Sequence, residues 1–199
     1  MFVRTESFSQ FIRFYPIISI IVFIHLVLYG MTILPLVPHL WVYEQLAGVN
    51  LYIFNGEWWR LFTPIFVHMG FAHFLFNSFS LVLFGPALER FLGKFWFVTV
   101  YLGTGIIANI ATYLFKPLTY SHVGASGAIF GLFGLYLAMV IFHKHMLTRQ
   151  NKQIILPIVV IGLIMTFVQS GINLTAHVVG LLAGVAIGWV LLPRLKRTF

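Results

Sequence analysis

Three short polar clusters interrupt an otherwise apolar chain, and their side chains are of the types that perform acyl-transfer chemistry. The first cluster contains His68, His73 and Asn77, the second is centred on Ser126, and the third on His177. A serine hydroxyl becomes a nucleophile when a base accepts its proton. A neutral histidine is the usual base near neutral pH. The sequence therefore predicts Ser126 as a nucleophile and His177 as its general base.

The oxyanion that forms in such a reaction needs preorganised hydrogen-bond donors. We expect Ser126 at a helix N-terminus, where its backbone N–H is free and the helix dipole favours negative charge. His73 and Asn77 are four residues apart, so they share a helix face and can add side-chain donors. The chain has no aspartate, and none of its glutamates falls within an expected membrane helix. The arrangement is therefore a dyad, and Phe130, one turn after Ser126, is a candidate ring to stack on His177.

Glycines follow both members of the expected dyad at helical spacing. Small residues let membrane helices approach closely. Packing of the two stripes would bring Ser126 and His177 within hydrogen-bond distance. The stripes are Gly127, Gly131 and Gly134 after the serine, and Gly180, Gly184 and Gly188 after the histidine.

Composition places this chemistry in a membrane. Of 199 residues, 60% are hydrophobic and 8% are charged, whereas a soluble domain has about 25% charged residues. Mean hydropathy is +0.98. These values exclude a soluble enzyme and a disordered chain. The net charge of +8 does not indicate nucleic-acid binding, because the basic residues lie between long apolar runs rather than in one patch.

Stretches without Asp, Glu, Lys or Arg set the expected helices. They cover residues 14–43, 61–88, 95–115, 117–143 and 153–193, and about 20 apolar residues cross a bilayer. The last stretch is long enough for two helices, with a turn near residues 169–173. We expect one domain over residues 1–199, an all-α polytopic membrane protein with six transmembrane helices at about 14–34, 70–88, 95–114, 125–142, 154–169 and 175–192.

Lysine and arginine predict the orientation, because cytoplasmic segments carry an excess of them. With the N-terminus inside, two basic residues, Arg60 and Lys116, lie outside. Both termini are then cytoplasmic, and all three polar clusters lie near the outer face. The expected inner residues are Arg4, Arg13, Arg90, Lys94, Lys144, Arg149, Lys152, Arg194, Lys196 and Arg197.

Other interpretations of the same residues stay open at this point. Gly-x-Ser-Gly in a membrane helix is often a packing feature alone. Membrane histidines also serve in proton paths, so a small transporter using His68, His73 and His177 is an alternative, although no buried carboxylate or inverted repeat supports it. The chain has no H-E-x-x-H segment, so we expect no metal. The lack of aspartate excludes a paired-aspartate protease.

Five motifs in order resemble the rhomboid family of intramembrane serine proteases, over nearly the whole chain. They are Trp59-Arg60, His68 with His73 and Asn77, Glu89-Arg-Phe-Leu-Gly93, Gly124-Ala-Ser126-Gly127, and Ala176-His177-Val-Val-Gly180. The resemblance implies a rhomboid-like bundle of the bacterial six-helix form. One departure is Phe130, where many bacterial members have tyrosine; the ring can still stack, but it has no hydroxyl to donate.

The resemblance also implies a role for each matching residue. Ser126 would be the nucleophile and His177 the general base, with His73, Asn77 and the Ser126 backbone N–H as the oxyanion site. The other matching residues would be supports, among them His68, Gly124, Gly127, Gly180, Trp59, Arg60, Glu89 and Gly93.

The implied activity is endopeptidase cleavage of single-pass transmembrane proteins near the outer membrane face, through an acyl-enzyme. The implied partners are those substrates, membrane lipid and water, with no cofactor and no nucleic acid, and the expected location is a bacterial plasma membrane. We expect the substrate to approach beside the helix at 154–169, which carries none of the motifs. The alternative is a non-catalytic rhomboid-like protein that binds membrane helices.

Overall fold

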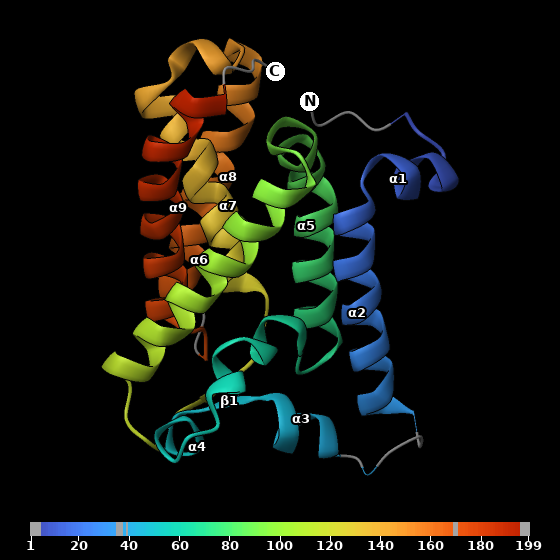
Figure 1. Ribbon diagram of the computed structural model, residues 1–199, viewed down its shortest axis with the longest axis vertical. Coiled ribbons are helices and arrows are strands. Elements are labelled where there is room, and N and C mark those ends of the chain that lie inside the picture. Colours follow the sequence, from blue (N-terminus) through green and yellow to red (C-terminus); the bar gives the residue numbers. More distant parts are fainter. Residues whose placement is uncertain (1–4, 35–37, 39, 169–170, 196–199) are drawn as a thin grey trace.

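The computed structural model describes residues 5–34, 38, 40–168 and 171–195. Six long helices dominate it (Figure 1). Apart from one pair of two-residue strands, the described elements are helical, which confirms the all-α prediction. The long helices are α2 (Pro16–Ile33), α5 (Phe71–Leu92), α6 (Lys94–Phe115), α7 (Ser126–Phe142), α8 (Arg149–Val168) and α9 (Leu174–Leu195).

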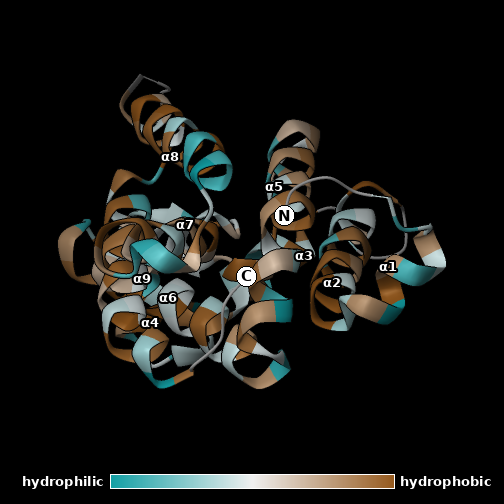
Figure 2. Cartoon of the chain, turned by 90° about the horizontal axis from the view of Figure 1, so that it is seen from above, coloured by the Kyte–Doolittle hydropathy of each residue, from teal (hydrophilic) through white to brown (hydrophobic). Residues whose placement is uncertain are grey.

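Five of these helices, α2, α5, α6, α8 and α9, are long and apolar enough to cross a membrane, judged by length and composition. The sixth, α7, is apolar but has 17 residues. It lies inside the bundle, and most of its side chains are buried by its neighbours. Large apolar side chains such as Phe23, Phe79 and Phe167 face outward from α2, α5 and α8, and Figure 2 shows the hydrophobic colour on these helices.

The observed helices extend past several predicted ends. The helix α5 continues from the predicted end at residue 88 to Leu92, and α8 begins at Arg149 rather than at 154. A charge-free stretch marks the part of a helix that suits hydrocarbon, whereas a helix continues through charged residues into the headgroup layer. Residue 169, at the end of the predicted fifth helix, lies outside the described residues, as do Arg4, Lys196 and Arg197.

The segment between α2 and α5 folds into short elements. It contains α3 (Trp41–Leu46), α4 (Asn50–Phe54) and two 3-10 turns, Trp58–Leu61 and Thr63–Phe66. Strand β1 (Gly48–Val49) pairs antiparallel with β2 (Ser121–His122), which joins this segment to the chain just before α7. Figure 1 shows these elements at one end of the bundle, the end at which α5, α7 and α9 begin.

The helices α7 and α9 touch through their backbones. A Cβ atom added to Gly180 would overlap the carbonyl oxygen of Gly127, and one added to Gly184 would overlap that of Gly131. A Cβ on Gly134 would likewise overlap the carbonyl oxygen of Leu181. The two predicted glycine stripes therefore do face each other, and they remove the side chains that would hold the helices apart.

A carboxylate joins α2 to α5. Glu89, which is 3% exposed, accepts hydrogen bonds from the backbone N–H groups of Ile17 (2.9 Å) and Ile18 (3.0 Å) at the start of α2. These groups have no partner within their own helix, and a negative charge suits a helix N-terminus. Gly93 ends α5 with φ +79°. Glu89 therefore binds the start of α2, and Gly93 ends α5 in a backbone conformation that favours glycine.

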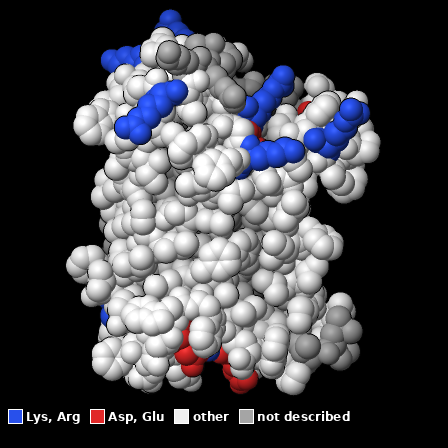
Figure 3. Space-filling model, viewed as in Figure 1, with Lys and Arg blue, Asp and Glu red and all other residues white. Residues whose placement is uncertain are grey.

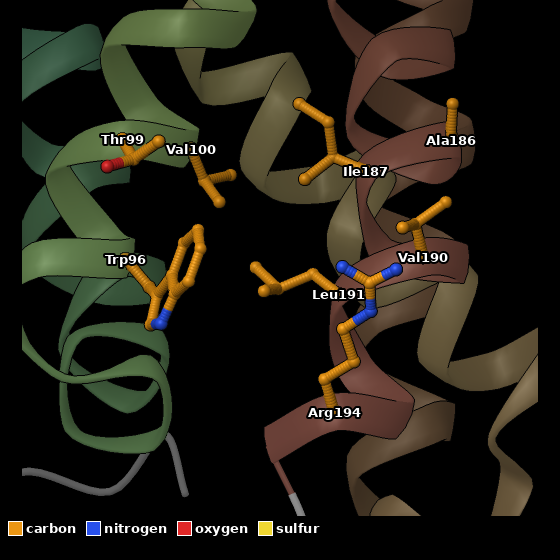
Figure 4. Close-up of a pocket in the computed structure, with 8 residues that line it drawn as sticks. All are labelled: Trp96, Thr99, Val100, Ala186, Ile187, Val190, Leu191 and Arg194. Carbon is orange, nitrogen blue, oxygen red and sulfur yellow. The ribbon is translucent and has the colours of Figure 1, made fainter.

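Charge is distributed unevenly along the bundle. Figure 3 shows Lys and Arg gathered at the end that holds α1 (Phe8–Phe14) and the last turn of α9. The glutamates, in red, appear mainly at the opposite end. A groove of about 450 Å³ between α6 and α9 also lies toward this basic end, with Trp96 and Arg194 in its lining (Figure 4). Arg194 lies 17 residues after His177 on α9, about 25 Å along the helix at 1.5 Å per residue, so the groove is separate from the predicted site.

We predict that Gly184→Ala destabilises the protein and that Gly103→Ala does not. The first change pushes a methyl group into the backbone of α7, and overpacking of this kind costs about 1–3 kcal/mol. The second lies in α6 with open space around it, and alanine favours a helix over glycine by up to about 1 kcal/mol. Thermal unfolding in detergent would compare the two. Equal melting temperatures would mean that the contact between α7 and α9 can relax at little cost.

Candidate active site

Ser126 is the first residue of α7, and its side chain is half-buried. The turn before it is held from the segment that precedes α5. The backbone N–H of Gly124 donates to the carbonyl of Pro64 (2.9 Å), and that of Ala125 donates to Nε2 of His68 (3.4 Å). Ser126 therefore sits where the free N–H groups of a helix N-terminus gather, on a turn fixed by two hydrogen bonds.

Gly124 is the tightest point of this turn. Its φ is +123°, a conformation that residues with a side chain rarely adopt. A Cβ at this position would also lie 2.5 Å from Nε2 of His73. The ring of His73 therefore reaches from α5 to the turn before Ser126, close to the backbone that was expected to form the oxyanion site.

Asn77 lies one turn after His73 on α5 and is 8% exposed. Its Nδ2 donates to the backbone carbonyl of His73 (2.9 Å). This bond uses one of the two amide hydrogens and leaves a second for another acceptor.

The ring of His177 is contacted on one face by Phe130 and at one edge by Thr166. It stacks on Phe130 with ring centroids 4.2 Å apart and an angle of 18° between the planes. This contact is the stacking that the sequence predicted. At one edge, Nδ1 of His177 lies 2.7 Å from Oγ1 of Thr166 on α8. His177 is 7% exposed, so the ring is fixed by packing as well as by this bond.

The glycine contact brings the serine and histidine segments together. A Cβ on Gly127, which follows Ser126, would lie 3.6 Å from the carbonyl oxygen and 3.7 Å from Cβ of Ala176, which precedes His177. The expected hydrogen bond between Ser126 and His177 is not among those formed by the described residues. Catalytic hydrogen bonds are often long without substrate and tighten in the complex.

His68 belongs to a group of three histidine rings. Its centroid lies 4.5 Å from that of His25 on α2 and 5.1 Å from that of His73. Burial, with a smaller effect from the two neighbouring histidines, lowers the pKa of His68 to about 2. The ring is therefore neutral at physiological pH, and its Nε2 can accept from Ala125. His68 therefore contacts the turn before Ser126, and its supporting role stays a prediction.

Arg60 and Trp59 make their contacts within the segment between α2 and α5. Arg60 is 3% exposed; Nη1 donates to Ala47 O (2.8 Å), Nη2 to Glu44 O (2.7 Å) and Nε to the Glu57 carboxylate (2.6 Å). Nε1 of Trp59 donates to the carbonyl of Gln45 (3.2 Å). These bonds tie the 3-10 turn to α3, and the supporting role of the two residues stays a prediction.

Sequence reasoning missed one residue of this region, Thr166. It is polar and lies in a stretch that was assigned to a membrane helix. Polar groups at such positions are costly and favour a specific partner. That signal was available, but the partner of Thr166 comes from another helix and no motif joins the two residues.

The chain is similar in sequence to known proteins. A family model described as "Rhomboid domain" matches residues 55–194. The chain is 46% identical over 199 residues to "Putative rhomboid protease YdcA" of Bacillus subtilis (strain 168), covering 100% of both chains. It is 42% identical over 138 residues to "Rhomboid protease GluP" of the same organism (69% of this chain, 27% of that one). It is 30% identical over 179 residues to "Rhomboid protease AarA" of Providencia stuartii (76% and 64%).

We predict that stability falls as the pH is lowered below about 6.5. His68 and His122 lie outside the long helices, and burial lowers their pKa values from 6.5 to about 2 and about 4. Above pH 6.5 both are neutral whether the protein is folded or unfolded. Below it, the unfolded chain binds protons that the folded protein does not, so the free energy of unfolding decreases by about 1.4 kcal/mol per pH unit for each. Unfolding in detergent between pH 7.5 and 5 would measure the slope.

His68→Gln keeps a side-chain acceptor for Ala125 and should flatten this slope. The matched control is His145→Gln, because the side chain of His145 is exposed, and this variant should keep the slope of the wild type. A slope that is the same in all three proteins would contradict the prediction.

Proposed function

Because this chain belongs to the rhomboid family, we propose that it is an intramembrane serine endopeptidase in which Ser126 is the nucleophile and His177 the general base. The observation that carries the proposal is the contact of Gly127 with Ala176 and Gly180. This contact brings together the segment that carries Ser126 and the segment that carries His177.

The proposed reaction has two steps. Nε2 of His177 accepts the proton of Ser126 Oγ as Oγ bonds to the scissile carbonyl carbon, and the same proton then goes to the leaving amine. This step gives an acyl-enzyme and one cleaved chain. Water then attacks the ester with His177 again as base, which releases the second product and restores the serine.

The oxyanion of each step would lie at the N-terminus of α7. We propose the backbone N–H of Ser126, the ring N–H of His73 and the second amide hydrogen of Asn77 as its donors. The contact of His73 with the Gly124 turn and the free hydrogen of Asn77 support this assignment. Donors fixed before the reaction stabilise the charge without reorganisation.

We further propose six membrane spans, with α7 as the shortest, and both termini in the cytoplasm. The gathering of Lys and Arg at the end that holds α1 and the last turn of α9 supports this orientation (Figure 3), because cytoplasmic segments are enriched in these residues. Ser126 would then lie near the outer face, and the protein would be a multi-pass component of a bacterial plasma membrane.

The proposed substrates are single-pass membrane proteins cut near the outer end of their helix. A transmembrane helix hides its carbonyl groups in hydrogen bonds, so the cut requires local unwinding, which Gly, Pro or polar residues favour. The substrate helix would approach beside α8, which lies at the rim of the bundle (Figure 2) and is the least buried of the five candidate spans.

We predict that a fluorescent fluorophosphonate labels the detergent-purified wild type and labels neither Ser126→Ala nor His177→Ala. The probe reacts with an activated serine and requires no known substrate. The first variant removes the reacting atom, and the second removes the base. Labelling is read by in-gel fluorescence, with Ser121→Ala as a matched control because Ser121 lies in β2 and is exposed; its labelling should equal that of the wild type.

Labelling that persists in Ser126→Ala would place the nucleophile elsewhere. The wild type could also be folded, remain unlabelled and cleave none of a panel of single-pass test proteins in liposomes. That result would favour the alternative of a non-catalytic protein that binds membrane helices.

We predict that a photo-crosslinking residue at Met165 on α8 captures a single-pass test helix with Gly-Pro near its outer end, and that one at Ile107 on α6 does so at least about fivefold less. Both side chains are exposed, at 47% and 41%, so exposure to lipid does not distinguish them. The Ser126→Ala background prevents cleavage, and crosslinks are counted on gels. Equal capture at the two positions would overturn the proposed path beside α8.

A further inference from the structure

The hydroxyl of Thr166 lies between a backbone carbonyl and the ring of His177. Its Oγ1 is 2.8 Å from the carbonyl oxygen of Gly162, one turn earlier on α8, and 2.7 Å from Nδ1 of His177 on α9. Thr166 is 4% exposed, so bulk water does not compete for either contact.

Counting hydrogens assigns the direction of both bonds. A threonine hydroxyl has one hydrogen, and a carbonyl oxygen has none. The short contact to Gly162 can be a hydrogen bond when Thr166 donates its hydrogen there. The contact with the ring is then a hydrogen bond when Nδ1 of His177 carries a hydrogen and donates it to Oγ1. In a neutral ring, the lone pair is then on Nε2.

We propose that Thr166 is a positioning residue that holds His177 as the Nδ1–H tautomer, with Nε2 free to accept a proton. The consequence for catalysis rests on the proposed function, in which Nε2 is the base for Ser126. The tautomer itself does not depend on that function. In a Ser-His-Asp triad a carboxylate performs this orienting task.

No carboxylate on the helices that carry the site competes for the role. The sequence has no Asp or Glu after residue 89, so α7, α8 and α9 carry none. Glu89 accepts from the start of α2, and Glu57 pairs with Arg60. A neutral hydroxyl orients the ring without placing a charge inside the membrane, where an ionised side chain is costly.

The stacking on Phe130 and the bond to Thr166 restrict different motions. The stack fixes the plane of the His177 ring, with centroids 4.2 Å apart. It does not distinguish the ring from one that is flipped over about its Cβ–Cγ bond and lies in the same plane. The bond at Nδ1 makes that distinction, because turning the ring over would place a carbon at Oγ1. Gly162 packs against Phe130, because a Cβ added to Gly162 would lie 3.4 Å from Cζ of Phe130. The turn of α8 that begins at Gly162 and ends at Thr166 therefore supports both contacts.

The tautomer can be read directly by NMR of ¹⁵N-histidine-labelled protein in detergent micelles. The His177 signals are assigned by their loss in His177→Gln. In the wild type we expect a protonated Nδ1 and an unprotonated Nε2. Thr166→Val, which is close to threonine in shape, should shift His177 toward the other tautomer or a mixture, and Thr166→Ser should restore the wild-type pattern. A wild-type ring that is protonated at Nε2 would overturn the proposal.

The rate of fluorophosphonate labelling gives the second readout. We expect Thr166→Val to lower it by about tenfold or more, equivalent to about 1.4 kcal/mol of barrier, and Thr166→Ser to stay within about threefold of the wild type. Thr99→Val is the matched control, because its hydroxyl donates to Phe95 O one turn earlier on α6 (2.9 Å) in the way that Thr166 donates to Gly162; it should label like the wild type.

The two readouts separate the two proposals. If the wild type shows the Nδ1–H tautomer but is not labelled, the proposed function fails and the assignment of Thr166 stands. If Thr166→Val is folded by its melting temperature and is labelled at the wild-type rate, Thr166 does not position the base. The latter result overturns the inference and leaves the Ser126 and His177 assignments intact.

Discussion

The direct backbone contact between α7 and α9 is the constraint on which the rest of the site depends. It exists because Gly127, Gly131, Gly180 and Gly184 place no side chain between the two helices. Within a membrane there is little hydrophobic driving force between helices, so close packing supplies much of their association. The same contact that stabilises the bundle sets the separation of Ser126 from His177. Packing and the proposed chemistry are therefore two results of one interface.

Several buried polar groups around this interface are engaged by specific partners. His68 receives the Ala125 N–H, Asn77 donates to its own helix, and Thr166 joins two helices. Each partner is neutral, and this choice follows from the solvent, because hydrocarbon penalises charge far more than an uncharged dipole that has a hydrogen bond. Charged groups such as Arg60 and Glu89 act near the ends of the helices, where they bind free backbone groups.

Much of this arrangement follows from sequence, because each part depends on a local rule. Charge-free stretches located the long helices, and helical spacing placed Phe130 over His177 as the structure has it. The contact of Thr166 with His177 was not predicted, since it depends on how α8 and α9 are rotated relative to each other. The order within the segment between α2 and α5 was also missed, because Arg60 organises it by binding the backbone carbonyls of Ala47 and Glu44. The position of Ser126 Oγ relative to the ring depends on one side-chain torsion, which residue spacing does not define.

The order of these residues along the chain also affects when the protein acquires activity during its synthesis. The nucleophile is proposed on α7, whereas its base lies on α9 and the hydroxyl that orients the base lies on α8. A ribosome that has delivered five of the six long helices to the membrane has made a serine without a base. The glycine face of α7 then has no α9 against which to pack. If Ser126 and His177 act as proposed, a chain without α9 would be inert toward neighbouring membrane proteins, and insertion of the last helix would complete both the fold and the proposed catalytic centre.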